Sequence, residues 1–433
     1  MNIRNYLPFA IAALFLLGAC QTASNEKTPP VQPDADNGQI QLPENFGALV
    51  VADNLGKARH LVVRENGDIY VAIQNMKNGG GIAALRDTSG DGKADLIQYF
   101  GEYPGTGIDI RNNYLYFSPD SALFRYRLNE DKLVPEADFE TIVYGLTSQN
   151  QHAAKSFTFD GSGNVYINIG APSNACQDPD RTPGVKGQDP CPILEYAGGI
   201  WRFSAEKTGQ SQQDGYRYAT GIRNAVALDW NSAENTLYAL QHGRDQLSNL
   251  WPDLFTDEES AELPAEEFLL IKDGSDFGWP YCYFDPSQNK RVLGPEYGGD
   301  GTQTGRCDSA ENPIMAFPAH WAPNDVLFYT GDQFPERYKN GAFIAFHGSW
   351  NRAPLEQAGY VVVFVPFDGA HPAGDWEIFA EGFTGADTLL SPGDARFRPM
   401  GLAQGPDGSL YIADSQQGRV WRVVYQENPE PGS

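Results

Sequence analysis

Basic and imidazole side chains stand directly before several short apolar runs of this chain. These residues are His60, His152, Arg223, Asn224, His320, Arg396 and Arg398. Arginine and histidine are costly to desolvate unless they bind an anion or each other. If the apolar runs converge in space, the sequence therefore predicts a site for an anionic ligand. The structural alternative is that these arginines pair with acidic residues of neighbouring loops.

A repeated pattern indicates what brings these residues together. It consists of Gly or Asn, a variable residue, an apolar residue and then an aromatic residue. The six aromatic residues are Tyr70, Tyr116, Tyr166, Tyr238, Phe343 and Tyr411. Alternating apolar runs flank most copies, which is typical of the turn of a β-hairpin. Successive aromatics lie 46, 50, 72, 105 and 68 residues apart by subtraction of these positions.

Intervals near 45–50 residues, with insertions, predict an all-β fold, a six-bladed β-propeller. In a propeller the first strand of each blade lines the central channel, and the loops that enter these strands meet at one mouth. The residues before the apolar runs should then meet at that mouth. We expect residues 46–51 to pair with residues 420–424 and close the ring.

The first 42 residues differ from the rest. Arg4 supplies a positive charge, residues 7–17 form a short apolar segment, and Leu17-Gly18-Ala19-Cys20 resembles a bacterial lipobox. We therefore expect a lipoprotein signal peptide (residues 1–20), a disordered tether (21–42) and a propeller (43–428). Lipidation of Cys20 would make the protein an exported bacterial lipoprotein, and Gln21 favours the periplasmic side of the outer membrane. The alternative is ordinary secretion with an incidental cysteine.

Charge and cysteines narrow the possible partners. A net charge of −25 argues against nucleic acid and against an anionic membrane surface, so we expect membrane contact only through the lipid anchor. An exported chain with four further cysteines is expected to form disulfides. Four cysteines allow three pairings, and the spacings favour Cys176–Cys191 and Cys282–Cys307. A structural zinc site is the competing interpretation, although the chain has no CxxC pair.

Several motifs resemble those of the glucose/sorbosone dehydrogenase family. They are Thr220-Gly221-Ile222-Arg223-Asn224, Glu266–Ile271 with Phe277-Gly278-Trp279-Pro280, Phe346–Arg352, and Arg396-Phe397-Arg398. The resemblance covers about residues 43–426. The family consists of soluble-type sugar dehydrogenases that depend on pyrroloquinoline quinone (PQQ) and have a six-bladed propeller. The form of residues 347–352 looks closer to the L-sorbosone dehydrogenase branch.

The resemblance implies a role for each matching position. His152 matches the general base that takes the proton from the sugar hydroxyl, a task suited to a pKa near the working pH. Arg223 and Asn224 match the pair that contacts the quinone, with Arg223 stabilising developing charge. Arg396 and Arg398 match the two arginines that bind the carboxylates of PQQ.

The resemblance also implies a metal and the reaction partners. A calcium ion is expected on the backbone carbonyls of Gly243 and Arg244, because calcium accepts oxygen ligands. The expected partners are a small sugar or aldehyde substrate and an unidentified electron acceptor.

Two positions depart from the best-studied branch of that family. The acid that supports the catalytic histidine there is matched by Ala171, which predicts a weaker or differently oriented base. The lysine that binds the cofactor has no counterpart in residues 346–352, so Arg352 or His347 would replace it.

Two acidic segments and two other classes of function stay open. Asp87–Asp95 has the oxygen spacing of a calcium loop but Gln98 at its twelfth position, and it would serve equally as a turn. Asp253–Glu267 is expected to be a solvated insertion, with Glu266 as a support for calcium as the alternative. The chain could also be a lipid-anchored propeller that binds sugar or protein without redox activity. A third possibility is a calcium-dependent lactonase-type hydrolase.

Overall fold

The computed structural model describes Met1 and residues 31–136 and 138–426, which contain six sheets of four or five strands, antiparallel except where β13 joins β9 and β18 joins β14. Strands β2–β5 form the first blade, β6–β9 with β13 the second, and β10–β12 with β14 and β18 the third. The fourth blade is β15, β16, β17 and β21, and the fifth is β22, β23, β24 and β27. The sixth is β28, β29, β30 and β1, so the six-bladed propeller predicted from the repeats is confirmed.

The strand bounds of the first three blades are as follows. They are β2 Ala58–Val63, β3 Ile69–Lys77, β4 Gly80–Arg86 and β5 Leu96–Phe100; β6 Gly107–Arg111, β7 Tyr114–Ser118, β8 Leu123–Arg127, β9 Glu140–Tyr144 and β13 Gln210–Ser211; β10 Phe157–Phe159, β11 Asn164–Ile169, β12 Gly199–Ser204, β14 Tyr216–Thr220 and β18 Ser275–Asp276.

The last three blades and two small hairpins complete the set of strands. They are β15 Ala227–Asn231, β16 Thr236–Gln241, β17 Glu266–Ile271 and β21 Met315–Phe317; β22 Pro323–Phe328, β23 Ala342–Phe346, β24 Val361–Val365 and β27 Glu377–Ala380; β28 Pro399–Gln404, β29 Leu410–Asp414, β30 Val420–Tyr425 and β1 Phe46–Ala52; and the hairpins β19 Cys282–Asp285 with β20 Lys290–Leu293 and β25 Phe367–Asp368 with β26 His371–Pro372.

The ring closes where the chain ends meet. β1 pairs with β30 in antiparallel register, with Phe46 opposite Tyr425 and Leu49 opposite Arg422, so the predicted closure is confirmed. The inner strands β2, β6, β10, β15, β22 and β28 contact one another around the axis and line a narrow channel. Each copy of the repeated pattern begins in the turn between the first and second strands of its blade and continues into the second strand, as the hairpin prediction required.

The aromatic residues of the pattern join neighbouring blades. Tyr70, Tyr116 and Tyr238 are completely buried, and their side chains pack in the interior. The Tyr70 hydroxyl donates to the carbonyl of Leu133 at 2.9 Å, and the Tyr116 hydroxyl donates to that of Ala205 at 3.0 Å. Both carbonyls belong to the connection between the third and fourth strands of the next blade. A buried phenol needs such a partner, so this repeat fixes one blade against the next.

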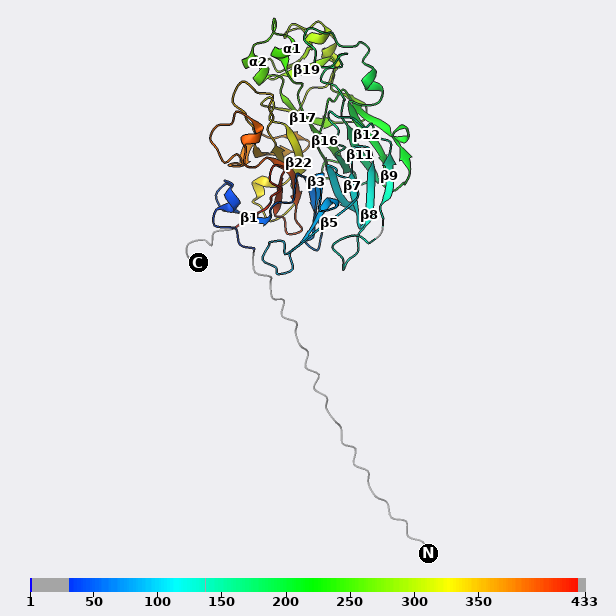
Figure 1. Ribbon diagram of the computed structural model, residues 1–433, viewed down its shortest axis with the longest axis vertical. Helices are drawn as coiled ribbons and strands as arrows, with labels where there is room; N and C mark the ends of the chain where they lie inside the picture. Colours follow the sequence, from blue (N-terminus) through cyan, green and yellow to red (C-terminus); the bar gives the residue numbers. More distant parts are fainter. Residues whose placement is uncertain (2–30, 137, 427–433) are drawn as a thin grey trace. The chain divides into compact units, whose positions relative to one another are not determined.

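Long insertions cover one end of the propeller. Helices α1 Leu247–Leu250 and α2 Asp257–Glu262 lie between β16 and β17, and the β19–β20 hairpin follows β17. Figure 1 shows α1, α2 and β19 together beyond β16 and β17. The short 3₁₀ turns are η1 Asn37–Gln39, η2 Pro192–Glu195, η3 Gln212–Asp214, η4 Pro295–Tyr297, η5 Gly305–Ser309, η6 Glu336–Tyr338 and η7 Pro392–Asp394. In the described part of the chain, no helix is long and apolar enough to cross a membrane.

Covalent and local predictions can be checked directly. Both disulfides, Cys176–Cys191 and Cys282–Cys307, are present as predicted. The Asp87 carboxylate accepts hydrogen bonds from the backbone N–H groups of Gly90 and Gly92, each at 2.7 Å. The segment Asp87–Asp95 therefore satisfies its carboxylates internally and needs no calcium to hold its turn.

The ordered domain begins earlier than predicted. Residues 31–42 were expected in the disordered tether, but Asp34 accepts a hydrogen bond from Val50 N–H at 2.8 Å and pairs with Lys93 at 2.7 Å. The carbonyl of Gly38 accepts from the indole of Trp421 at 2.9 Å. Residues 31–42 therefore pack against the sixth blade. The Gly38 carbonyl supplies the hydrogen-bond acceptor that the buried indole of Trp421 needs. Cys20, the signal peptide and residues 21–30 lie outside the described residues.

Candidate active site

A cavity of about 340 Å³ opens where loops lead into the inner strands. Most of its lining residues lie at the start of or just before β2, β6, β10, β15 and β22, and the others lie in β3 or just after β7 and β16, so five blades contribute. The size is suited to a small ligand, since such pockets measure about 300–1,000 Å³. Its polar lining residues are Arg59, Gln74, Thr106, Asp120, Asn150, His152, Asn224, His242 and Asn324. We call this cavity the mouth.

His152 is held in the mouth by a main-chain carbonyl. Its Nδ1 lies 2.6 Å from the carbonyl oxygen of Ala171. Because a carbonyl oxygen only accepts, Nδ1 carries the proton in the neutral ring and Nε2 keeps its lone pair. The main chain of Ala171 thus holds the ring at the position where its side chain offers no carboxylate.

The surroundings of His152 also set its charge and its backbone. Burial, followed by the positive charge of Arg223, lowers the pKa of His152 to about 3, well below the working range expected from the sequence. The ring is thus neutral with a free lone pair at Nε2, but the lowered pKa makes it a weaker base than an ordinary histidine. His152 has a φ of 51°, in the left-handed region that non-glycine residues rarely occupy. A Cβ at Gly170 would lie 2.8 Å from His152 Cβ, so only glycine permits this close approach.

Arg59 places an unmatched positive charge on the wall of the mouth. It is the second residue of β2, and its Nε donates to the Thr106 hydroxyl at 3.3 Å. Among the described residues, no carboxylate lies within 4 Å of its guanidinium, although Asp120 also lines the cavity. Burial lowers the pKa of Arg59 to about 10, which leaves it charged at neutral pH. A partly buried cation without a carboxylate in ion-pair distance favours an anionic ligand.

Arg223, in contrast, already has a counter-ion. Its Nη2 donates to Asp245 Oδ2 at 2.6 Å and its Nη1 donates to the Gly243 carbonyl at 2.9 Å. Arg181 donates to the same Asp245 oxygen at 2.7 Å, so one carboxylate lies between two arginines. Burial opposes the charge of Asp245, but the two arginines outweigh it and lower the pKa of Asp245. Asn224, the neighbour of Arg223, lines the mouth as predicted.

The loop predicted to hold calcium lies behind Arg223. The Gly243 carbonyl accepts from Arg223 and retains a second lone pair, and the Gly243 N–H donates to Glu266 Oε2 at 2.9 Å. The Arg244 side chain turns away and pairs with Glu296. Within the described residues, no group of three or more His, Cys, Asp or Glu side chains is arranged to hold a metal ion. A cation here would therefore depend on main-chain oxygens.

Glu266 is a buried carboxylate without a cation close by. It is 2% exposed, and no Lys, Arg or His nitrogen of the described residues lies within 4 Å of it. Burial raises the pKa of Glu266 to about 8 despite hydrogen bonds from Ala322 and Gly243. A divalent cation on the carbonyl side of the 243–244 loop would supply the missing positive charge. A cation would suit the charge of this carboxylate, but the described residues show no ligand set for calcium.

The predicted arginine pair divides between two places. Arg398 donates to the carbonyls of His347 at 3.1 Å and Gly348 at 2.5 Å, and it lies close enough to Arg59 to lower the pKa of that arginine. Arg396 is exposed, and its Nη1 donates to Gln39 Oε1 at 3.3 Å in the N-terminal segment. The buried Phe397 separates the two. Their hydrogen bonds do not form one clamp.

Two predicted mouth residues fix helix α2 instead. His320 Nε2 lies 2.8 Å from the carbonyl of Ser260, and Arg352 Nη1 donates to the carbonyl of Ala261 at 2.8 Å. Arg352 also pairs with Glu262 at 2.6 Å. A cationic donor such as Arg352 is favourable at the last carbonyls of a helix, whereas burial lowers the pKa of His320, which therefore contributes a hydrogen bond rather than a charge. His347, the other candidate for the missing lysine, has its Nε2 2.6 Å from the Ser415 hydroxyl.

His60 was expected at the mouth but lies deeper. It belongs to β2 and lines the channel cavity, with Nε2 2.8 Å from the carbonyl of Asn324. The preceding residue, Arg59, faces the mouth instead. Successive side chains of a strand point in opposite directions, so the position adjacent to the predicted one is the functional candidate.

Sequence reasoning missed Arg59, His242, Asp245 and Arg181. His242 follows β16 and lines the mouth, with Nε2 2.8 Å from the carbonyl of Pro323. Asp245 follows the predicted calcium loop, so that loop was a usable signal. Arg181 lies in a long insertion without any motif, and only the folded chain reveals its partners.

Comparisons with known proteins agree with this architecture. A family described as TrAA12-like matches residues 40–426. An uncharacterized protein of Borreliella burgdorferi is 24% identical over 431 residues, which cover 96% of this chain and 97% of that protein. The pyrroloquinoline quinone-dependent pyranose dehydrogenase of Coprinopsis cinerea is 29% identical over 238 residues, or 48% of this chain. The aligned part spans 31% of that dehydrogenase.

Solved structures share the fold at low identity. The calcium structure of the Trichoderma reesei Carbohydrate-Active Enzymes Family AA12 protein superposes with a TM-score of 0.73 at 17% identity, covering 90% of this chain and 97% of that one. The holo form of the pyranose dehydrogenase PQQ domain from Coprinopsis cinerea gives a TM-score of 0.71 at 18% identity, with coverages of 92% and 99%. These likenesses establish the propeller.

Proposed function

This chain belongs to the TrAA12-like family, and from that premise we propose that it is a PQQ- and calcium-dependent dehydrogenase that oxidises an aldose or a sugar aldehyde. The relative from Coprinopsis cinerea, a PQQ-dependent pyranose dehydrogenase, supports this class of chemistry. The observation that carries the proposal is the geometry of His152. Its Nδ1 lies 2.6 Å from a carbonyl, which leaves Nε2 able to accept a proton.

The residues of the mouth divide the work. Arg59, with no acidic partner within 4 Å among the described residues, would bind a carboxylate of the cofactor, and Asn224 would donate to it. Arg223 would stabilise developing negative charge from beside the mouth rather than by direct contact. Its guanidinium already pairs with Asp245. His152 would accept the hydroxyl proton of the substrate at Nε2. When bound, PQQ would supply a quinone that takes the hydride equivalent from the carbon.

Calcium would occupy the region of Gly243 and Arg244 through main-chain carbonyls, with Glu266 as the charge behind it. The predicted roles of Arg396, Arg398 and Arg352 in cofactor binding follow from the resemblance. Of these three arginines, Arg398 is the best candidate for binding the cofactor, because it lies close to Arg59 in the mouth.

Reconstitution tests the proposal. Purified apo-protein with PQQ and calcium should develop the quinone absorbance, and a sugar or sugar aldehyde should bleach it. Omission of calcium should weaken both signals. Absence of PQQ binding to the wild type in the presence of calcium would remove the dehydrogenase assignment and leave a propeller that binds sugar or protein.

The hydrolase alternative receives less support from the mouth. A lactonase-type site needs carboxylates and amides around a central metal. Among the residues that line the mouth, Asp120 is the single carboxylate, and the remaining charged or titratable groups are arginine and histidine.

We further propose that the protein is exported and lipidated at Cys20, which would place it on the periplasmic side of the outer membrane. Support comes from the lipobox-like Leu17-Gly18-Ala19-Cys20 and from the two disulfides, which suit an oxidising compartment. Its electron acceptor would then be a partner of the same compartment.

A further inference from the structure

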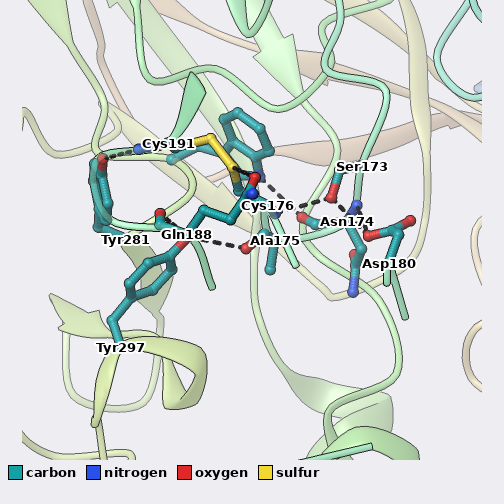
Figure 2. Close-up of a disulfide and its surroundings, with 10 residues drawn as sticks. Ser173, Asn174, Ala175, Cys176, Asp180, Gln188, Cys191, Tyr281 and Tyr297 are labelled. Carbon is teal, nitrogen blue, oxygen red and sulfur yellow. Dashed lines mark hydrogen bonds between the residues drawn. A yellow bond between two sulfur atoms is a disulfide. The ribbon is translucent and has the colours of Figure 1, made fainter. Parts of the chain in front are cut away.

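A disulfide-closed loop approaches the mouth from the third blade. It lies between β11 and β12, and Cys176 and Cys191 join its ends with Cα atoms 6.1 Å apart. Figure 2 shows this disulfide between the side chains of Tyr281 and Tyr297 on one side and Asp180 on the other. The Tyr281 hydroxyl accepts from Cys191 N–H at 2.9 Å, and the Tyr297 hydroxyl donates to the Ala175 carbonyl at 3.0 Å. The outer side of the loop is thus fixed.

The inner side of the loop holds the residue next to the proposed base. Asp180 Oδ2 accepts from the amide of Gln151 at 3.0 Å, and Arg181 Nε donates to the oxygen of the same amide at 3.2 Å. Both ends of the Gln151 side chain are therefore bound by consecutive residues of the loop. Gln151 directly precedes His152, whose left-handed backbone must be stabilised by its surroundings.

The same arginine reaches the other half of the site. Arg181 Nη1 donates to Gln246 Oε1 at 2.8 Å, and Nη2 donates to Asp245 Oδ2 at 2.7 Å. Asp245 also binds Arg223, so Arg181 links the segment of His152 to the Arg223–Asp245 pair. Arg181 itself does not line the mouth. Any effect it has on the reaction must act through these neighbours.

We propose that Arg181 is a positioning residue, which fixes the His152 segment and the Arg223–Asp245 pair in one geometry. The inference rests on the proposed function for its consequence in catalysis, but the orientation of His152 can be measured without cofactor. A planar guanidinium matches three acceptors on two loops at once, whereas a lysine ammonium lacks this fork. The positive charge at the position is a separate property, which a lysine retains.

Three variants separate these properties. Arg181→Ala removes the fork and the charge, and Arg181→Lys removes only the fork. Lys186→Ala is the matched control, because Lys186 is an exposed basic residue of the same disulfide-closed loop and has no hydrogen bond or ion pair with other described residues. All are made in the full chain with both disulfides intact.

Nitrogen NMR of protein labelled at histidine reports the orientation. The chain has six histidines, so the His152 signal can be assigned by its loss in His152→Ala. In the wild type and in Lys186→Ala we expect the ring to carry its proton at Nδ1, as the hydrogen bond to Ala171 requires. In Arg181→Ala and Arg181→Lys we expect a mixture of the two tautomers.

Kinetics of the reconstituted protein report the consequence. We expect both Arg181 variants to lower kcat by about 10–100-fold, the usual range for a residue behind the reacting groups, with a smaller change in KM. Wild-type tautomer and kcat in both variants would overturn the positioning role. A loss in Arg181→Ala that Arg181→Lys restores would overturn it in favour of a charge effect. Altered tautomers in a protein whose wild type binds no PQQ would support the positioning role and refute the proposed function.

Discussion

The mouth and the channel of this propeller lie on the same axis but have opposite electrostatics. The channel cavity, of about 240 Å³, is lined by all six inner strands and contains Asp109, Asp229 and Asp325. Burial raises the pKa of Asp109 to about 7 and that of Asp229 to about 6, so near neutral pH Asp109 is partly protonated whereas Asp229 stays mostly ionised. The mouth contains Arg59, which stays charged and has no acidic partner within 4 Å among the described residues.

Neighbouring residues of one strand belong to different cavities. Arg59 lines the mouth and His60 lines the channel, and Asn324 and Asp325 divide in the same way. The presence of polar residues near the axis therefore does not identify the ligand site. The mouth is distinguished by an arginine with no carboxylate within 4 Å among the described residues, whereas the channel contains carboxyl groups whose pKa values burial raises.

The strongest test of this comparison is the base in the mouth. We expect His152→Ala to leave PQQ bound and to lower kcat by roughly 10²–10⁴-fold, the usual share of a general base. His371→Ala is the control, because His371 is exposed on β26 and remote from both cavities. Stopped-flow reduction of the bound cofactor measures the effect. Unchanged reduction in His152→Ala would show that another group accepts the proton.

The unmatched arginine is the next test. We expect Arg59→Ala to weaken PQQ binding by about 1.5–3 kcal/mol, the scale of hydrogen bonds to a charged group. Arg127→Ala on the exposed end of β8 should bind PQQ like the wild type, because it removes an arginine outside both cavities. Titration followed by absorbance gives the affinities. Equal affinity in Arg59→Ala and wild type would refute the anionic-ligand interpretation of the mouth.

Much of the fold followed from the sequence, because the signal was local and repeated. Six aromatic turns predict six blades, and the spacing of the cysteines predicts both disulfides. The positions of His152, Arg223 and Asn224 at or beside the mouth followed from their place before inner strands. The separation of Arg59 from His60 did not, since it depends on which face of β2 turns toward the mouth.

Other features of the site required the folded chain. The support of His152 by the Ala171 carbonyl could not be predicted, because every residue carries a carbonyl and only the fold selects one. Arg352 and His320 have the right residue types for an anion site. In the folded chain, however, they form hydrogen bonds to carbonyls of α2, which belongs to an insertion between β16 and β17. The sequence-based prediction of the site therefore failed where long segments between strands provide hydrogen-bond partners.

A smaller difference is expected between Arg396 and Arg398, the two arginines that the sequence predicts to bind PQQ together. The sequence alone predicts equal losses for Arg396→Ala and Arg398→Ala, but the structure separates them. We expect Arg398→Ala to weaken PQQ binding by about 1–2 kcal/mol and Arg396→Ala by less than about 0.5 kcal/mol, because an exposed arginine loses little when it is removed. The same absorbance titration tests both. Equal losses would restore the predicted clamp and imply that Arg396 leaves Gln39 when the cofactor binds.

The channel should respond to pH rather than to the cofactor. Asp109 has its pKa raised from an ordinary value near 3.8 to about 7 by burial, followed by repulsion from Asp229. Between these pH values the folded protein binds more protons than the unfolded chain, so its stability falls as pH rises from about 4 to about 7. One such group contributes a slope of at most about 1.4 kcal/mol per pH unit.

Asp109→Asn should remove this contribution, because the amide resembles the protonated carboxyl at every pH. Urea unfolding at pH 4.5, 6 and 7.5 should therefore show a smaller loss of stability in Asp109→Asn than in the wild type, and PQQ affinity should not change. Asp131→Asn, at an exposed position, should follow the wild-type curve. If Asp109→Asn instead weakened PQQ binding, the channel would contribute to the ligand site and the electrostatic division between channel and mouth would be wrong. If the stability curves of wild type and Asp109→Asn were parallel and PQQ affinity were unchanged, Asp109 would have an ordinary pKa. Raised pKa values in the channel would then be confined to Asp229 and Asp325.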